Sequence, residues 1–326
     1  TYPLRWWAFG PFWRYEKPQK GRTREFFQWN IDLIGVHTPE ADAELIAISA
    51  ELFKKIGLKP DKVKIFINDR QLMDLKLSDI GIDNSQKKNA LKIIDRRDKM
   101  RSDAWKEFAL ELGLTEKQFK SLSEILENKE LYKESSNLEK VFSAIEKLGI
   151  KEYVEYDPMI VRGLDYYTGI VFEARDVGKS SRAILGGGRY DNLVNDVGGD
   201  PLTGIGFAMG DVVLPIILDE YELLPTLKIN PAKILMTIFD SETASKSLST
   251  AALLRAAGIP VLLFPEEAKL GKQFKFADRN EIPYAIIIGP DEIKEGIIQI
   301  KDMQTREQVS VKNKELISYF QGLLAE

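Results

Sequence analysis

The chain has 326 residues, 44% of them hydrophobic and 29% charged, which suits a globular protein of about two domains. It has no cysteine and a single histidine, His37, so disulfides, zinc–thiolate sites, cysteine nucleophiles and multi-histidine metal sites are excluded. With a net charge of −4, any nucleic-acid binding must rest on a local basic patch.

The beginning of the chain reads as two strands followed by a helix. Residues 4–13 and 26–34 are rich in aromatic side chains and flank a polar, basic segment, which predicts two strands joined by a charged loop. Thr38 is a good N-cap, Pro39 suits the first helical position, and a helix over 41–55 ends at Gly57. His37 lies just before this helix with no motif around it, and we interpret it as a surface residue. Residues 63–67 alternate like a half-buried strand.

A helical insert is predicted between about residues 85 and 150. Leu, Ile and Phe recur there at helical spacing among many Lys and Glu residues. Thr115 and Gln118 form a capping-box pattern, and Ser136 is the predicted cap of the helix over 138–148. From residue 153 to residue 214 strand signals return, with many glycines.

The C-terminal part predicts a small α/β domain. A domain boundary is expected at 224–232, where the pairs Leu224-Pro225 and Asn230-Pro231 lie on either side of a short polar linker. Strands at 234–239, 261–264 and 284–288 alternate with helices at 245–257 and 269–280, which favours a largely parallel sheet. A hairpin at 297–301 and 308–311 and a helix at 313–325 complete the pattern.

Five cations lie within the eleven residues from Arg14 to Arg24. One interpretation is a solvated, charged turn, and composition alone favours it. The other is a polyphosphate-binding loop, in which Arg and Lys side chains bind the phosphates. The segment 12–26, with its Lys-Pro-Gln-Lys-Gly-Arg core, resembles motif 2 of class II aminoacyl-tRNA synthetases, in the form found in the histidine-specific branch. The resemblance implies an ATP site made by Arg14, Glu16, Arg22 and Arg24, in which Arg14 is a catalytic ligand of the α-phosphate. It also implies tRNA contacts by Lys17 and Lys20, and places Gln28 and Asp32 beside the amino-acid substrate.

The stretch from Arg162 to Glu173 is the most diagnostic in the chain. From its residues alone it is a strand pair around a tight turn at Thr168-Gly169, and an ordinary hairpin with core tyrosines is an equal reading. It resembles the signature block of histidyl-tRNA synthetases. The resemblance implies that Arg162 is catalytic, between the α-phosphate and the histidine carboxylate. It also implies that Tyr166 and Tyr167 lie at the imidazole, with Tyr190 of the Gly186–Asp191 segment as a further ligand of the ring.

Two features depart from the family pattern. The segment 204–211 falls at motif 3, where Gly204 and Gly206 are expected to pass beneath the adenine. Asp211 and the three apolar residues after it then replace the usual Glu-Arg pair. Either another cation takes the arginine's role, ATP binding is weaker, or the chain is a subtype; Asp211 is a minor candidate for a magnesium contact. The chain also starts in mid-domain without methionine, so we expect an N-terminal part with motif 1 to be missing.

Residues 254–260, 271–278 and 286–289 resemble the anticodon-binding domain of this synthetase subgroup. Lys272 and Lys275, with Lys269 and Arg279, are candidate tRNA contacts, although a solvated helix face is at least as good a reading of each.

The resemblance therefore implies an α+β catalytic domain over 1–226, built on an antiparallel sheet of the class II type with a helical insert, followed by an anticodon-binding α/β domain over 232–326. The implied activity is ATP-dependent activation of L-histidine and its transfer to tRNA(His), with Mg²⁺ accompanying ATP. The expected enzyme is a cytoplasmic homodimer that does not enter membranes. The alternatives are a non-catalytic, histidine-sensing regulatory subunit, which typically lacks the basic loop, the signature arginine and the anticodon domain, and a truncated tRNA-binding module.

Overall fold

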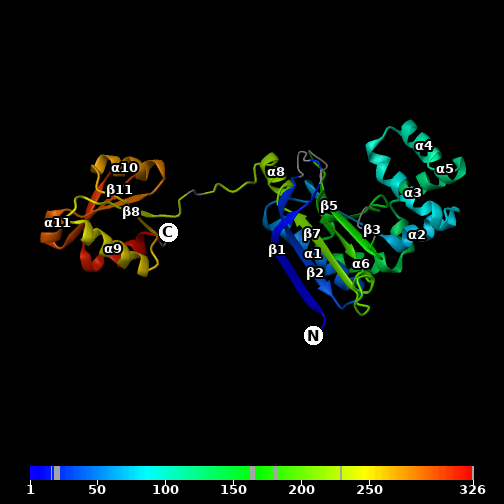
Figure 1. Cartoon of the computed structure of the whole chain (residues 1–326), viewed down its shortest axis with the longest axis horizontal. Coiled ribbons are helices and arrows are strands. Elements are labelled where there is room, and N and C mark those ends of the chain that lie inside the picture. Colours follow the sequence, from blue (N-terminus) through cyan, green and yellow to red (C-terminus); the bar gives the residue numbers. More distant parts are fainter. Residues whose placement is uncertain (16, 18–22, 162–165, 179–182, 228–229, 325–326) are drawn as a thin grey trace. The chain divides into compact units, whose positions relative to one another are not determined.

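The computed structural model describes residues 1–15, 17, 23–161, 166–178, 183–227 and 230–324. The chain forms two compact units, Thr1–Leu224 and Pro225–Glu326 (Figure 1). Each unit has its own sheet and its own hydrophobic core, so each is described by itself.

The first unit is built on a seven-stranded sheet in the order β1-β2-β7-β6-β5-β3-β4. Neighbouring strands are antiparallel except for the parallel pair β3–β4, which confirms the predicted fold class. The strands are β1 (Leu4–Trp13), β2 (Glu25–Ile34), β3 (Val63–Asp69), β4 (Val154–Tyr156), β5 (Ile170–Asp176), β6 (Ala183–Arg189) and β7 (Gly204–Gly210).

The aromatic segments at the start of the chain are the predicted strand pair. β1 and β2 pair over their whole length, from Leu4 opposite Ile34 to Trp13 opposite Glu25. β1 lies at the edge of the sheet, and its tryptophans at positions 6, 7 and 13 are 63–69% exposed. Such an aromatic surface on an edge strand is unusual for a protein that acts alone.

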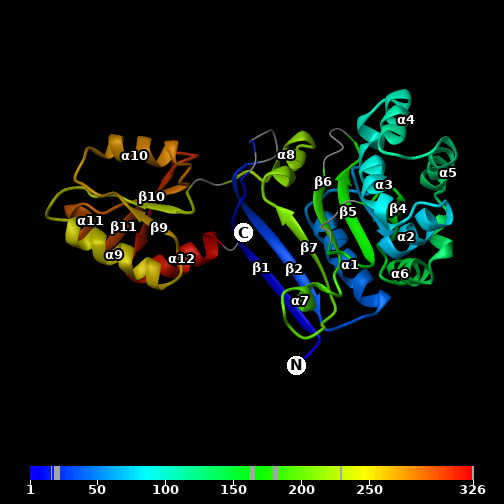
Figure 2. The same cartoon turned by 45° about the vertical axis from the view of Figure 1, so that its right-hand side comes forward.

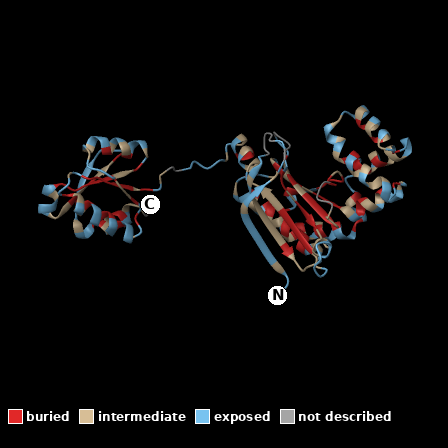
Figure 3. Cartoon of the chain, in the orientation of Figure 1, coloured by how far each residue is buried: buried red, intermediate tan, exposed pale blue. Residues whose placement is uncertain are grey.

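Helix α1 (Pro39–Lys55) covers one face of this sheet and buries its apolar side together with α6 (Ser136–Lys147) (Figure 3). The Thr38 hydroxyl accepts a hydrogen bond from the Ala41 N–H at 3.3 Å, which confirms the predicted N-cap. Gly57 has φ +82°, a backbone angle that favours glycine, and the chain turns there into the next strand.

Helices fill most of the segment predicted as an insert, and they gather beside β3 and β4 (Figure 2). They are α3 (Asn84–Arg96), α4 (Ser102–Glu111) and α5 (Glu116–Glu127), preceded by an unpredicted helix, α2 (Arg70–Asp79). The capping box of Thr115 and Gln118 is confirmed. The predicted cap Ser136 is wrong: the hydroxyl of Ser135 accepts from the Leu138 N–H, because the helix begins one residue earlier than that choice requires. Two short helices, α7 (Leu193–Asp196) and α8 (Val213–Glu220), flank β7 in the sequence.

The second unit is the smaller α/β domain. Its sheet has the order β12-β11-β10-β8-β9, with β8, β9 and β10 parallel and β11–β12 an antiparallel hairpin, as predicted. The strands are β8 (Ile234–Met236), β9 (Val261–Leu263), β10 (Tyr284–Ile287), β11 (Ile297–Asp302) and β12 (Gln308–Lys312). The helices are α9 (Ala244–Ala256), α10 (Leu270–Arg279), α11 (Pro290–Glu295), which the pattern did not predict, and α12 (Leu316–Leu323).

Candidate active site

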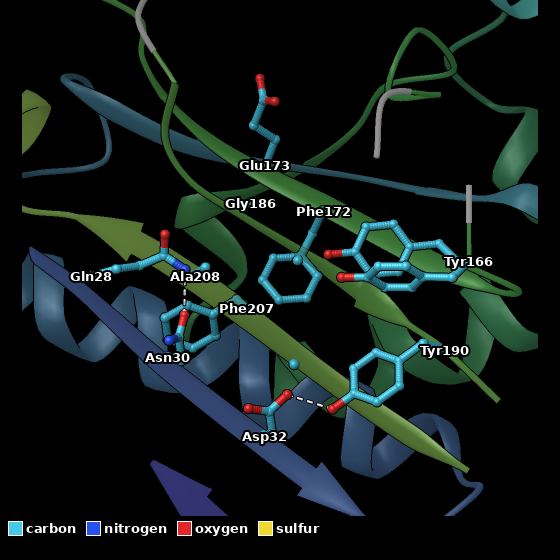
Figure 4. Close-up of a pocket in the computed structure, with 13 residues that line it drawn as sticks. Gln28, Asn30, Asp32, Tyr166, Phe172, Glu173, Gly186, Tyr190, Phe207 and Ala208 are labelled. Atoms are coloured by element: carbon cyan, nitrogen blue, oxygen red, sulfur yellow. Dashed lines mark hydrogen bonds between the residues drawn. The ribbon is translucent and has the colours of Figure 1, made fainter. Parts of the chain in front are cut away.

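The strand register puts two polar walls on either side of a floor of small residues. Across the sheet, Asn30 on β2 aligns with Ala208, then Gly186, then Glu173 on β5. The neighbouring row begins at Asp32 and continues through two glycines. Because side chains alternate between the faces of a strand, all these residues share the face opposite the helix-covered core. All of them except the second of these glycines line a cavity of about 460 Å³ (Figure 4).

The glycines of the floor are required by the side chains above them. A Cβ on Gly206 would lie 2.1 Å from Oδ1 of Asp32, and one on Gly204 would lie 2.4 Å from the ring of Tyr190. Contacts this short do not occur, so any larger residue would displace these two side chains. The sequence interpretation places both glycines beneath adenine; here they pack against the side chains expected at histidine, and the contact with adenine stays a prediction.

Asp32 and Tyr190 form the polar pair at one end of the cavity. The Tyr190 hydroxyl donates a hydrogen bond to Oδ1 of Asp32 (Figure 4). Burial raises the pKa of Asp32 above its usual 3.8, and the bond from Tyr190 partly opposes that rise. Burial and the Asp32 carboxylate both raise the pKa of Tyr190, so the phenol stays protonated and acts as a donor.

Tyr166 and Tyr167 stand beside this pair. Their ring centroids are 4.9 Å apart at a steep angle, and the Tyr166 ring meets the ring of Tyr190 edge-on at 6.0 Å. Burial raises the pKa of Tyr167, so its hydroxyl is neutral. One carboxylate and three phenols therefore converge on one end of the cavity, an arrangement that can bind a small ring with one N–H donor and one nitrogen acceptor.

Gln28 and Asn30 form the polar wall further along β2. Nε2 of Gln28 donates to Oδ1 of Asn30 at 2.6 Å (Figure 4), which leaves the Gln28 carbonyl oxygen to accept from a ligand. Glu173 stands on the opposite wall, ion-paired with Arg175. Asn30 and Glu173 were not predicted as site residues, because only the strand register shows that they share a face with Gln28 and Asp32.

Arg14, the predicted phosphate ligand, is held at the end of β1. Its guanidinium lies 3.9 Å above the ring centroid of Phe26, and its backbone N–H donates to the carbonyl of Arg24 at 2.8 Å. Its Nε is buried without a hydrogen-bond partner among the described residues. Arg24 lies over the ring of Tyr15 at 5.9 Å, and Lys17 is exposed. Four predicted ligands lie outside the described residues: Glu16, Lys20, Arg22 and Arg162.

The signature block differs from the predicted strand pair. Of its described residues, only those from Ile170 onward form a strand, β5, which pairs with β3 and β6. Thr168 and Gly169 form the approach to that strand. The predicted hairpin is wrong because both edges of β5 are already paired, one with β3 and the other with the following strand, β6.

Arg189 is buried beneath the site and was not predicted to have a role of its own. Its guanidinium binds the carboxylate of Asp42 on α1, the carbonyl of Val36 at 3.0 Å and the carboxylate of Asp191 at 3.1 Å. Burial raises the pKa of Asp42 to about 6, while the bonds from Arg189 favour its ionised form. This pair ties α1 to β6, and so fixes the strand that carries the glycine floor.

Asp211 follows β7 and is hydrogen-bonded to β2, the strand that carries Gln28. Its Oδ1 accepts from the Phe27 N–H at 3.0 Å, and its own N–H donates to the Phe27 carbonyl at 3.0 Å. The residue at the motif 3 position therefore has a structural contact. Among the described residues no group of three acidic or histidine side chains is placed to hold a metal ion.

In the second unit, Lys272 and Lys275 are exposed on α10, and Nζ of Lys272 pairs with Glu266 at 2.7 Å.

His37, in the first unit, is largely exposed, with Nδ1 3.5 Å from a carboxylate oxygen of Asp191. No helix in the described part of the chain is both long and apolar enough to cross a membrane.

An antiparallel sheet backed by helices, with a polar pocket over a glycine floor and a separate α/β domain, is the architecture of class II aminoacyl-tRNA synthetases. Two sequence families match: "Histidyl-tRNA synthetase" over residues 1–211 and "Anticodon binding domain" over residues 233–323. The chain belongs to the histidyl-tRNA synthetase family.

Individual relatives agree with this assignment. The chain is similar to the histidine–tRNA ligase of Opitutus terrae, with 34% identity over 96% of this chain and 75% of that protein. It is 35% identical to the histidine–tRNA ligase of Pyrococcus horikoshii over 99% of this chain and 78% of that protein. Among solved structures, the histidyl-tRNA synthetase of Nostoc sp. PCC 7120 superposes with a TM-score of 0.82 at 27% identity, covering 98% of this chain and 78% of that one.

Proposed function

We propose that this protein activates L-histidine with ATP and transfers the histidyl group to tRNA(His). The observation that carries the proposal is the convergence of Asp32, Tyr190 and the Tyr166–Tyr167 pair at one end of a cavity in a chain of this family. In the first step a histidine carboxylate oxygen attacks the α-phosphorus of ATP, the bond to the β-phosphate breaks, and pyrophosphate leaves. In the second step a terminal ribose hydroxyl of the tRNA attacks the histidyl carbonyl and AMP leaves.

Histidine is selected by hydrogen-bond pairing in this proposal. The Asp32 carboxylate accepts from one imidazole N–H, and a phenol of the tyrosine pair donates to the other ring nitrogen. Tyr190 orients Asp32 through its own hydroxyl. An amino acid without these nitrogens would leave buried polar groups unpaired, a mismatch that discriminates by roughly 10⁴–10⁵ in sites of this kind. The Gln28 carbonyl oxygen accepts from the ammonium group of histidine.

Arg14 stabilises the charge that develops on the α-phosphate. A buried Nε without a partner among the described residues and a guanidinium held 3.9 Å above the Phe26 ring are what an arginine awaiting an anionic ligand would show. We assign Arg162, from the signature block, the same role: its guanidinium is the second to bind this phosphate. Glu16, Arg22 and Arg24 complete the ATP site, and Mg²⁺ enters with the phosphates of ATP.

The second unit binds the anticodon of tRNA(His), with exposed Lys272 and Lys275 near the RNA backbone. A homodimer in the cytoplasm is the proposed working form, and the exposed aromatic surface of β1 is consistent with an interface. The comparisons do not favour the histidine-sensing regulatory alternative, because the relatives are named histidine–tRNA ligases.

Histidine-dependent ATP–pyrophosphate exchange tests the proposal. Arg14→Ala and Arg162→Ala should each lower the exchange rate by at least ~10², as the loss of one donor to a developing oxyanion does. Arg5→Ala is a matched control on the same strand, because Arg5 forms an exposed ion pair with Glu44 at 2.8 Å and lies outside the cavity. Unchanged exchange in the Arg14 and Arg162 variants would refute their roles, and wild-type protein without exchange or tRNA charging would refute the function.

A further inference from the structure

The junction between β3 and α2, residues 68–71, is hydrogen-bonded to the chain both before the signature block and within it, after the tyrosine pair. Asn68 is fully buried, and its Nδ2 donates to the carbonyls of Pro158 at 3.1 Å and Ile160 at 3.2 Å. These carbonyls lie on the N-terminal side of the block. The junction is thus bonded to the chain just before the residues that the signature contributes.

The same junction is bonded to the chain just after the tyrosine pair. The Arg70 N–H donates to the Gly169 carbonyl at 3.0 Å, and Nε2 of Gln71 donates to the Thr168 carbonyl at 3.1 Å. On its other side, Thr168 donates its N–H to the Arg189 carbonyl at 2.8 Å. Thr168 is therefore held between the first turn of α2 and the end of β6.

The position of Thr168 decides where the Tyr167 ring lies. Tyr167 precedes it directly, and its ring packs over Gly188 so closely that a Cβ there would lie 3.0 Å from Cδ1 of the ring. A ring confined on one side by the floor and anchored at the next residue has little freedom to turn. Displacement by a fraction of an ångström would change how its hydroxyl meets a ligand.

We propose that Gln71 is a positioning residue for histidine recognition, acting through its hydrogen bond to Thr168 on the Tyr166–Tyr167 pair. This inference rests on the proposed function, because it names imidazole as the group that the pair binds. Gln71 is suited to the role because its backbone is already fixed: its N–H donates to Oδ1 of Asp69, the N-cap of α2, at 2.9 Å. Its side chain is exposed and is not needed by the core.

The junction is also bonded to the last helix of the insert, α6. The other oxygen of Asp69 accepts from the Ser135 hydroxyl at 2.9 Å, and Ser135 caps α6. One carboxylate therefore joins the start of α2 to the start of α6. Gln71 links this part of the chain, through the Thr168 carbonyl, to the tyrosine pair that lines the cavity.

The test compares Gln71→Ala and Gln71→Met, which lack a donor, with Gln71→Lys, which keeps one. Gln86→Ala is the matched control, because Nε2 of Gln86 also donates to a backbone carbonyl, that of Gly113 at 3.2 Å, but within the insert. Histidine and ATP affinities of the whole protein are measured by isothermal titration calorimetry, exchange kinetics give KM and kcat, and thermal unfolding monitors the fold.

The two donor-free variants should weaken histidine binding and raise its KM by roughly 2–10-fold, the equivalent of one neutral hydrogen bond. ATP binding, kcat and the unfolding midpoint should stay within experimental error, and Gln71→Lys should recover most of the histidine affinity. The inference is overturned if the Gln71 variants match Gln86→Ala in histidine affinity, or if they lose stability and affinity for both ligands together. Wild-type protein that does not bind histidine would instead reject the proposed function and this inference with it.

Discussion

Removing one hydroxyl, in Tyr190→Phe, should weaken both the fold and histidine binding in a pH-dependent way. The hydroxyl donates to the Asp32 carboxylate, whose pKa burial already raises above 3.8. A hydrogen bond to a charged group contributes ~1.5–3 kcal/mol, and since Asp32 is only half-buried we expect a loss of about 1–2 kcal/mol near pH 7. The phenyl ring still covers Gly204, so the packing is preserved.

The sign of the pH dependence follows from the direction of the shift. A carboxyl group with a folded-state pKa above its unfolded value makes the fold more stable when it is protonated, and this stabilisation is lost as pH rises through the folded-state pKa. Loss of the Tyr190 hydroxyl raises that pKa further. The variant should therefore differ most from wild type at pH 7–8 and progressively less as the pH falls through the raised pKa of Asp32.

Urea unfolding from pH 4 to pH 8 measures the loss of folding stability. Calorimetry at pH 7 should show that the affinity for histidine falls ~3–10-fold, because Asp32 is no longer oriented. Tyr153→Phe is the control: its hydroxyl donates to a neutral acceptor, the Leu58 carbonyl at 3.0 Å, so its cost should be the same at every pH. If the Tyr190→Phe penalty is also flat across this range, the hydroxyl does not act on the charge of Asp32 and the reasoning is wrong.

Other substitutions separate the fold from the site. Arg189→Met should cost ~3–5 kcal/mol in urea unfolding at pH 8, because it leaves the Asp42 carboxylate buried and unpaired, and less at acid pH, where that carboxyl, with a pKa of about 6 in the native protein, is protonated. Gly187→Ala should lower stability by ~1–3 kcal/mol, since its Cβ would lie 2.4 Å from the Gly206 carbonyl oxygen. Gly186→Ala, with nothing nearer than 3.9 Å, should unfold like wild type but bind histidine or ATP less well, because its methyl group enters the cavity. Lys275→Glu should weaken tRNA binding in a filter assay while amino-acid activation is unchanged; equal tRNA affinity would remove α10 from the proposed surface.

The sequence predicted elements whose determinants are local and missed those that depend on distant partners. The helix α1 was predictable because Thr38, Pro39 and Gly57 mark its ends within the sequence itself. The helix α2 was missed, since its cap Asp69 is also the last residue of the preceding strand, β3, and no separate start signal marks the helix. Neighbouring serines at 135 and 136 could not be distinguished as caps without the helix start.

The site residues show the same difference between those that the sequence could indicate and those that depend on distant partners. Gln28 and the tyrosine pair were named through the family resemblance, and they line one cavity. The resemblance did not name Glu173 or Asn30, and no pattern in the sequence aligns residues on strands separated by two others. The pairing of Arg189 with Asp42 was equally hidden, because the two are 147 positions apart.

The glycines of two separate segments have one common explanation. Gly186 and Gly188 on β6, and Gly206 with Ala208 on β7, are spaced by two, which is the period of one face of a strand. β6 and β7 are neighbours, and their register places Gly186 beside Ala208 and Gly188 beside Gly206. These four positions therefore form one continuous patch of small residues, which Asp32 covers at Gly206 and Tyr167 covers at Gly188, and which is open at Gly186. Small residues offer a ligand few distinguishing groups, so its identity must be read by the walls. This is why the carboxylates, phenols and amides of the walls can determine the specificity of the cavity. Substitutions on the floor should therefore affect every ligand, while substitutions on the walls should discriminate among them.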